Sequence, residues 1–281
     1  VWGHDYASGL THSLRRGARW VTSNPCKIQL FKKDFPDYYQ ELIAEIKREN
    51  AGATPAVMAA QMFTKVCAIS ARALYPIFKA TNKQYGFVCV QVDPRDIKDA
   101  DAMIKQVEFW YDAMKKELGV EEPNVVFKLP AVEAALEAAR ILLEKNYKLC
   151  MTMNITVPQH LRFAEILSKG KKNGYLVLMG DQLDDQIAKE LEAKGVENAK
   201  DIAKHGAEAV IRKSYRLLAE KGYKNLSIMT AAVCGPWHIQ NSFAPVGGAP
   251  VLITTVTGKI NQFDAEPTPF DSLMNQPVEE K

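Results

Sequence analysis

Short apolar segments, each closed by polar residues, glycine or proline, recur along the chain and predict buried β-strands. These eight segments are residues 1–5, 18–25, 85–94, 124–130, 148–154, 174–180, 225–230 and 250–255. Most are separated by segments whose apolar positions recur with helical spacing, at residues 37–49, 55–75, 98–118, 132–144, 157–169, 184–194 and 199–221. Caps support several of them: Asp34 or Asp37 for the first, Thr54-Pro55 for the second, and Gly119 closing the third.

This alternation predicts an α/β protein, a single-domain (β/α)8 TIM barrel over residues 1–263, followed by a loosely ordered tail at residues 264–281. A length of 281 residues suits one such barrel. The alternative is an open, doubly wound sheet. No G-x-G-x-x-G or Walker glycine loop follows any predicted strand, so the nucleotide-binding forms of that alternative lose their motif support.

Composition narrows the function classes. The chain has 36 basic and 33 acidic residues, a net charge of +3, and no long run of like charge, so we expect neither a nucleic-acid nor a membrane partner. The five cysteines include no C-x-x-C pair, which argues against a disulfide framework or a thiolate zinc site and favours a reducing cytoplasm. We expect no metal and no cofactor.

A lysine stands in the middle of the apolar segment 124–130. Side chains alternate along a strand, so Lys128 shares a face with Val126, while Val125, Phe127 and Leu129 share the other. Burial disfavours the charged form of an amine, and a neutral amine attacks carbonyl carbons to form Schiff bases. The alternative is a lysine at a strand end whose stem reaches towards water.

Polar residues stand at or near the carboxyl ends of the predicted strands, where barrel enzymes build their active sites. They are Asp5, Asn24, Gln91, Lys128 and Thr152. Buried polar groups are costly unless they find partners, so five of them at one rim indicate a shared network. Either this network is catalytic, or it is a hydrogen-bonded structural layer.

Four segments resemble, in the same order, motifs of the transaldolases. Trp20–Pro25 resembles T-T-N-P, Val90–Arg95 resembles E-V-D-P-R, Val126–Ala131 resembles I-K-I-P-A, and Met151–Asn154 resembles N-x-T-L-x-F. The resemblance extends from about Asp5 to Thr152 and weakens afterwards.

The resemblance implies a class I aldolase mechanism on a (β/α)8 barrel, without metal. Lys128 matches the Schiff-base lysine and would attack a ketose carbonyl. Asp5 matches the aspartate that takes the proton from the C4 hydroxyl. Thr152 matches the threonine, and Asn24 the asparagine, that position a water or the bound dihydroxyacetone unit. Thr22, in the same segment as Asn24, is a further candidate for substrate binding.

The chain departs from the family pattern in two places. Gln91 replaces the usual glutamate, and an amide can orient water but cannot accept its proton. The fructose-6-phosphate aldolase-like branch also carries glutamine at this position, so the resemblance favours reversible aldol cleavage. The arginines expected after strands six and seven are absent, and Asp181 stands where one of them would face a phosphate. We therefore expect phosphosugars to be poor substrates. The long following loop that bears His238 either supplies a recognition surface for an unphosphorylated polyol or only stabilises and closes the barrel.

The leading hypothesis is thus a lysine-dependent enzyme that cleaves or transfers a dihydroxyacetone unit of a ketose. Its partner would be a sugar or sugar phosphate, and a homo-oligomer is compatible with the sequence. A second hypothesis is a catalytically silent barrel that binds a sugar or a protein partner. A third is a barrel enzyme with other chemistry, such as isomerisation, using Asp5 as base.

Overall fold

The computed structural model describes residues 2–6, 9–235, 237–238, 252–255 and 257–265. Its strands are β1 (Trp2–His4), β2 (Val21–Thr22), β3 (Val88–Gln91), β4 (Val125–Pro130), β5 (Leu149–Asn154), β6 (Gly174–Met179), β7 (Leu226–Ala231) and β8 (Leu252–Thr255). Each overlaps a predicted strand segment, and only β7 extends beyond its segment, by one residue to Ala231.

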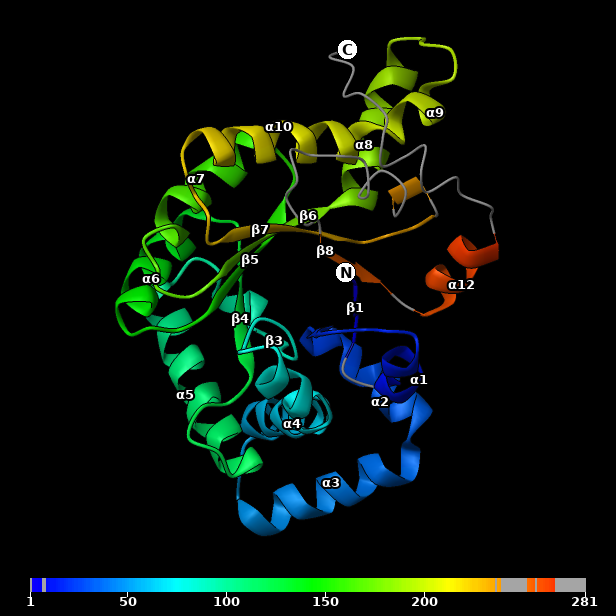
Figure 1. Ribbon diagram of the computed structural model, residues 1–281. Helices are drawn as coiled ribbons and strands as arrows, with labels where there is room; N and C mark the ends of the chain where they lie inside the picture. Colours follow the sequence, from blue (N-terminus) through cyan, green and yellow to red (C-terminus); the bar gives the residue numbers. More distant parts are fainter. Residues whose placement is uncertain (1, 7–8, 236, 239–251, 256, 266–281) are drawn as a thin grey trace. The chain divides into compact units, whose positions relative to one another are not determined.

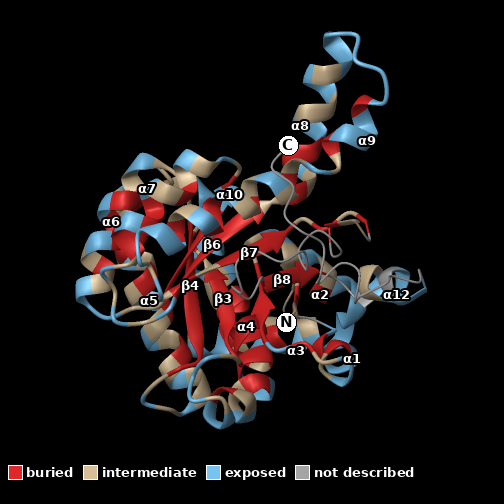
Figure 2. Cartoon of the chain, turned by 45° about the horizontal axis from the view of Figure 1, so that its top comes forward, coloured by how far each residue is buried: buried red, intermediate tan, exposed pale blue. Residues whose placement is uncertain are grey.

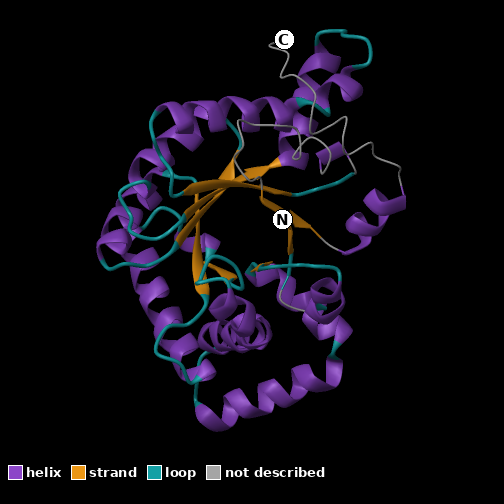
Figure 3. Cartoon of the chain, in the orientation of Figure 1, coloured by secondary structure: helices purple, strands orange, loops and turns teal. Residues whose placement is uncertain are grey.

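The helices alternate with these strands (Figure 3). They are α1 (Leu10–Arg15), α2 (Ile28–Asp34), α3 (Pro36–Glu49), α4 (Pro55–Ala80), α5 (Ala100–Leu118), α6 (Glu133–Glu144), α7 (Val157–Leu167), α8 (Gly180–Ala193), α9 (Ala199–Ala203), α10 (Gly206–Glu220) and α12 (Thr257–Ala265), with 3₁₀ turns η1 (Pro25–Lys27) and η2 (Pro94–Asp96).

The strands follow one another in chain order, from β1 to β8, in a closed barrel. The pairings described within each half are all parallel. The predicted (β/α)8 fold class is therefore confirmed. By internal contacts the chain divides into two compact units, residues 3–128 and the described residues from 129 onwards together with Trp2. Each unit is described separately below (Figure 1).

Burial follows the strand and helix pattern. The strands are almost entirely buried, whereas helices such as α6, α7 and α10 have one buried and one exposed face (Figure 2). Apolar side chains at helical spacing produce this arrangement, because only one stripe of each helix is removed from water. The strands thus have one face packed on helices and one turned away from them, and that second face holds the candidate residues.

Helix ends explain several boundaries. Thr54 accepts a hydrogen bond from the amide of Val57 and Pro55 occupies the first turn of α4, as predicted. Gly119 ends α5 with a φ of 65°, also as predicted, since glycine adopts left-handed geometry without a steric penalty.

The cap predicted from Asp34 or Asp37 is wrong. Helix α3 begins at Pro36, and its N-cap residue is Phe35, which makes no side-chain capping bond. Asp34 is instead the last residue of α2, a short helix that the pattern did not reveal. Proline at the first helical position has no N–H to be capped and sets the helical φ, so it starts the helix without a polar cap.

The single helix predicted over residues 199–221 is also wrong, because α9 ends at Ala203 and α10 begins at Gly206. A Cβ atom at Gly206 would lie 2.3 Å from Cδ1 of Ile187 in α8. The glycine therefore allows the start of α10 to approach α8 closely, and the chain turns there. Of the predicted tail, residues 264–265 belong to α12, and residues 266–281 lie outside the described residues.

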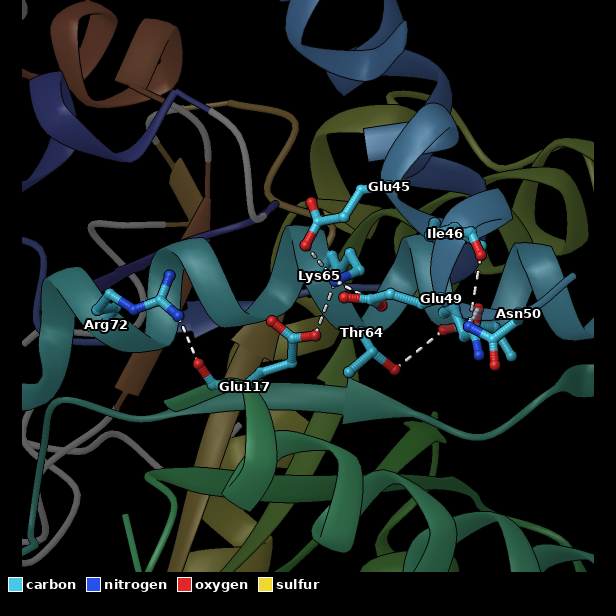
Figure 4. A network of polar contacts seen from close by, with 10 residues as sticks. Glu45, Ile46, Glu49, Asn50, Thr64, Lys65, Arg72 and Glu117 are labelled. Atoms are coloured by element: carbon cyan, nitrogen blue, oxygen red, sulfur yellow. Dashed lines mark hydrogen bonds and ion pairs between the residues drawn. The ribbon is translucent and has the colours of Figure 1, made fainter. Parts of the chain in front are cut away.

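A buried lysine joins three helices in the first unit (Figure 4). The Lys65 ammonium in α4 lies 2.8 Å from Glu45 and 3.2 Å from Glu49, both in α3, and 2.9 Å from Glu117 in α5. Burial lowers the pKa of Lys65, but the hydrogen bonds to Glu45 and Glu117 outweigh it and raise the pKa overall. This network fixes α3 and α5 against α4.

Candidate active site

Strand register places the predicted residues of the first unit on one face. Thr22 pairs with Cys89, and Gln91 pairs with Lys128. Because paired residues of neighbouring strands share a face, and because Cys89 and Gln91 are two residues apart, Thr22, Gln91 and Lys128 point to the same side. His4 pairs with Val21, so the next residue, Asp5, belongs with Thr22.

That side is the one turned away from the helices. Two residues before Thr22 and Cys89 along their strands, Trp20 and Phe87 stack at 5.9 Å between ring centroids. The opposite face contacts helices, since His4 bonds to Ser13 of α1 at 2.8 Å and the ring of Phe127 lies 6.4 Å from that of Tyr111 in α5. In a (β/α)8 barrel the face turned away from the helices is the interior, so the candidate residues face inwards.

Lys128 is 8% exposed. Its backbone carbonyl accepts a hydrogen bond from the amide of Val92 at 3.1 Å, which fixes its position beside strand β3. Within the described part of the chain, its side chain makes no hydrogen bond or ion pair. The structure therefore agrees with a buried lysine rather than with one whose amine reaches into open solvent.

Asp5 follows β1 directly and has two polar neighbours. The hydroxyl of Thr22 donates to Oδ1 at 3.0 Å, and the ammonium of Lys27 lies 3.8 Å from Oδ2. Lys27 also lies over the ring of Tyr6, 5.8 Å from its centroid. One carboxylate oxygen is thus held by a neutral donor and the other faces a cation.

The sequence analysis did not predict Lys27 as a site residue. Its position three residues after Asn24, in the turn that follows strand β2, could have indicated it. Asn24 has an extended backbone, with φ −149° and ψ 159°, and its carbonyl accepts from the Lys27 amide at 3.0 Å in η1. The backbone of Asn24 therefore positions Lys27. The side chain of Asn24 itself is half-buried and lies beyond the end of β2.

Thr152 lies in the second unit, buried in β5. Its hydroxyl lies 4.0 Å from the sulfur of Met179 at the end of β6, and its carbonyl accepts from the Ala131 amide at 2.7 Å. The next residue, Met153, has a φ of 65°, and the register between β5 and β6 shifts there. Such a bulge redirects side chains at a strand end.

Asp181 and His238 lie at the ends of β6 and β7 in the same unit. The Asp181 amide, in the first turn of α8, donates to the carbonyl of Ala232 at 3.1 Å. His238 is buried, and its Nε2 lies 2.8 Å from Oδ2 of Asp184. Its Nδ1 accepts from the Cys234 amide at 3.2 Å. Both ring nitrogens therefore have partners inside the protein.

A Cβ atom at Gly180 would lie 3.0 Å from Nε2 of His238, so a side chain at this position would crowd the imidazole ring. Asp184 and Cys234, which hold the ring, were not singled out in the sequence. Asp184 lies inside a helical pattern, and Cys234 gave no motif.

Among the described residues, no three His, Cys, Asp or Glu side chains are grouped so as to hold a metal ion. No helix in the described ranges is long and apolar enough to cross a membrane.

Comparison with known proteins agrees with this fold. The family model Transaldolase/Fructose-6-phosphate aldolase matches residues 11–279. The chain therefore belongs to that family. The match begins after Asp5, so the correspondence of Asp5 rests on its place at the end of the first strand.

Curated relatives are distant. The transaldolase of Neisseria gonorrhoeae is 25% identical over 168 residues, covering 57% of this chain and 43% of the relative. Transaldolase 1 of Streptomyces avermitilis is 25% identical over 214 residues, covering 71% and 54%. The transaldolase of Mycobacterium leprae is 30% identical over 143 residues, covering 50% and 35%. The chain thus spans about a third to a half of the length of these relatives.

Proposed function

We propose that this protein is a Schiff-base aldolase of the transaldolase type, which cleaves or transfers the dihydroxyacetone unit of a ketose. The observation that carries the proposal is the burial of Lys128 on the same inner strand face as Thr22 and Gln91, with Asp5 directly after β1, the strand that pairs with the one holding Thr22. A buried amine on a strand face that also presents a carboxylate and an amide has the parts that a carbonyl reaction needs.

In this proposal Lys128 attacks the ketose carbonyl, and loss of water gives an iminium. The iminium draws electrons from the C3–C4 bond, so that bond breaks when a base removes the proton of the C4 hydroxyl. The aldehyde leaves, and the dihydroxyacetone unit stays on Lys128 as an enamine until a proton or an acceptor aldehyde arrives.

Asp5 is the proposed base. The Thr22 hydroxyl and the Lys27 ammonium hold its two oxygens, which orients the carboxylate towards the inner face. A proton-transferring group has to stand within hydrogen-bond reach of the proton it moves, so orientation of this kind contributes directly to rate.

Gln91 is paired with Lys128 in the strand register and is proposed to orient the water lost when the iminium forms. Its amide donates and accepts hydrogen bonds but does not take a proton at neutral pH. The resemblance to the fructose-6-phosphate aldolase-like branch, which carries glutamine at this position, favours aldol cleavage over group transfer. Thr152 and Asn24 are proposed to position water and the dihydroxyacetone unit, as the family resemblance implies.

We infer that the substrate lacks a strongly held phosphate. The family position of a phosphate-binding arginine is taken by Asp181, whose charge repels a phosphate. Unphosphorylated ketoses therefore fit the proposal better than sugar phosphates.

Release of dihydroxyacetone from fructose and from fructose 6-phosphate tests the proposal, comparing the native protein with Lys128→Met. The expected result is release that this substitution abolishes and that Lys98→Met, a change at an exposed lysine, leaves unchanged. Release that survives Lys128→Met would instead favour a barrel enzyme using Asp5 alone. No release from any ketose of a broad panel would favour the silent barrel that only binds.

A further inference from the structure

A cysteine, a histidine and an aspartate stand in a row at the ends of β6 and β7. Sγ of Cys234 lies 3.5 Å from Nδ1 of His238, and Nε2 of the same ring lies 2.8 Å from Oδ2 of Asp184. Cys234 follows β7, His238 comes four residues later, and Asp184 belongs to α8. We call these three residues the Cys234 triad.

The hydrogen bonds assign the tautomer of the ring. The Cys234 amide donates to Nδ1 at 3.2 Å, so Nδ1 is an acceptor and carries no proton. The proton then resides on Nε2, which donates to Asp184. The single lone pair of Nδ1 is thus shared between the Cys234 amide and the Cys234 thiol, and Asp184 orients the ring from its other nitrogen. A thiol, an imidazole acceptor and an orienting carboxylate are the parts of a nucleophile that is activated by a base.

The triad is built into the fold. His238 is 1% exposed, and the indole Nε1 of Trp237 donates a second hydrogen bond to Oδ2 of Asp184 at 3.3 Å. Oδ1 of Asp184 is buried and has no hydrogen-bond partner among the described atoms. A buried carboxylate with an unsatisfied oxygen stabilises positive charge on a neighbouring imidazole, as the ring requires once it has accepted a proton.

The thiol itself stays protonated at neutral pH. Burial, followed by a hydrogen bond to Asp181 and the charges of Asp181 and Asp184, raises the pKa of Cys234 to about 12. Attack by this sulfur therefore requires a base that takes the proton as the bond forms, and Nδ1 of His238 stands in contact with it. The Asp181 carboxylate beside the sulfur also disfavours negatively charged reagents.

We propose that the Cys234 triad is a second reactive site, at which the Cys234 thiol adds reversibly to a small uncharged aldehyde. A bond forms from Sγ to the carbonyl carbon while the C=O π bond breaks. His238 takes the S–H proton at Nδ1 and delivers it to the carbonyl oxygen, which gives a neutral thiohemiacetal. The step needs no oxidant, reductant or leaving group, and it rests on no part of the Lys128 proposal.

Peptide-resolved alkylation tests the triad, because the chain contains its own control. Cys26 is exposed and Cys234 half-buried, whereas Cys67, Cys89 and Cys150 are buried and report on unfolding. With iodoacetamide at pH 7.5, His238→Gln and Asp184→Asn are each expected to slow labelling of Cys234 by about tenfold or more and to leave Cys26 unchanged. Equal rates at Cys234 in the native protein and both variants, with the buried cysteines unlabelled, would overturn the proposal.

Reagent charge and an aldehyde supply the second readout. Iodoacetate is expected to label Cys234 more slowly than iodoacetamide does, relative to Cys26, and Asp181→Asn is expected to reduce that difference. Glycolaldehyde is expected to protect Cys234, but not Cys26, from iodoacetamide, and to do so equally in Lys128→Met. Protection that vanishes in Lys128→Met, or that is equal at both cysteines, would contradict a separate thiol site.

Discussion

The hydroxyl of Thr22 donates a hydrogen bond to Oδ1 of Asp5 across 3.0 Å, linking the ends of the first two strands. The other carboxylate oxygen faces Lys27. A short carboxylate side chain has few rotamers, and two partners on opposite oxygens reduce them further. In the proposed reaction this contact determines where the base points.

Removal of that hydroxyl is expected to slow the reaction more than it weakens binding. Thr22→Val leaves Oδ1 of Asp5 without its donor, and we expect kcat to fall about tenfold with a smaller change in KM. Thr22→Ser restores the donor and should recover most of the rate. Steady-state kinetics of ketose cleavage measure both. Equal kcat in Thr22→Val and the native protein would show that Asp5 is not held for catalysis by this bond.

The charge of Asp181 is expected to discriminate against phosphorylated sugars. Asp181→Asn should raise kcat/KM for fructose 6-phosphate relative to fructose by about fivefold, since it removes a repulsion that salt partly screens. As the salt concentration rises, the ratio of kcat/KM for fructose 6-phosphate to kcat/KM for fructose should become similar in the variant and in the native protein. A ratio that does not change on substitution would place Asp181 away from the bound phosphate.

The Lys65 network is expected to stabilise the first unit. Lys65→Met leaves Glu45, Glu49 and Glu117 without their shared cation, and we expect the free energy of unfolding to fall by about 2 kcal/mol. Urea denaturation followed by circular dichroism measures this loss. Lys83→Met, which breaks the exposed pair with Glu122, is the matched control and should leave the midpoint in place. Equal midpoints for the two variants would contradict this account of the network.

Stability is expected to fall in mild acid because of His160. Burial lowers its pKa to about 4 from 6.5, and Nε2 has no partner among the described atoms. Below pH 6.5 the unfolded chain takes up a proton that the folded chain does not, so this residue costs about 2 kcal/mol of stability at pH 5 relative to pH 7.5. His160→Phe should reduce that loss. The matched control is His205→Gln, a substitution at an exposed histidine, followed by the same urea unfolding experiment.

The elements were predictable because the apolar spacing is regular. The strand containing Val125 and Phe127 was predicted with its correct faces, since side-chain alternation follows from backbone geometry alone. The break before α10 was not predicted. It depends on the room that Gly206 gives to Ile187, a contact between residues 19 apart along the chain.

The candidate site was predictable where strands carry it. Strand register and side-chain alternation place Thr22, Gln91 and Lys128 on one face. Lys27 and the Cys234 triad were missed because they depend on turns, whose backbone angles determine where a side chain points. The contact of His238 with Asp184 joins residues 54 positions apart, which no local pattern encodes.

Borohydride reduction in the presence of dihydroxyacetone tests the central claim, that Lys128 is a Schiff-base nucleophile. The predicted result is a covalent gain equal to dihydroxyacetone less one oxygen atom, located on the peptide that contains Lys128 and absent from Lys128→Met. A protein that gains no mass, or gains it equally at exposed lysines and in Lys128→Met, would contradict the account.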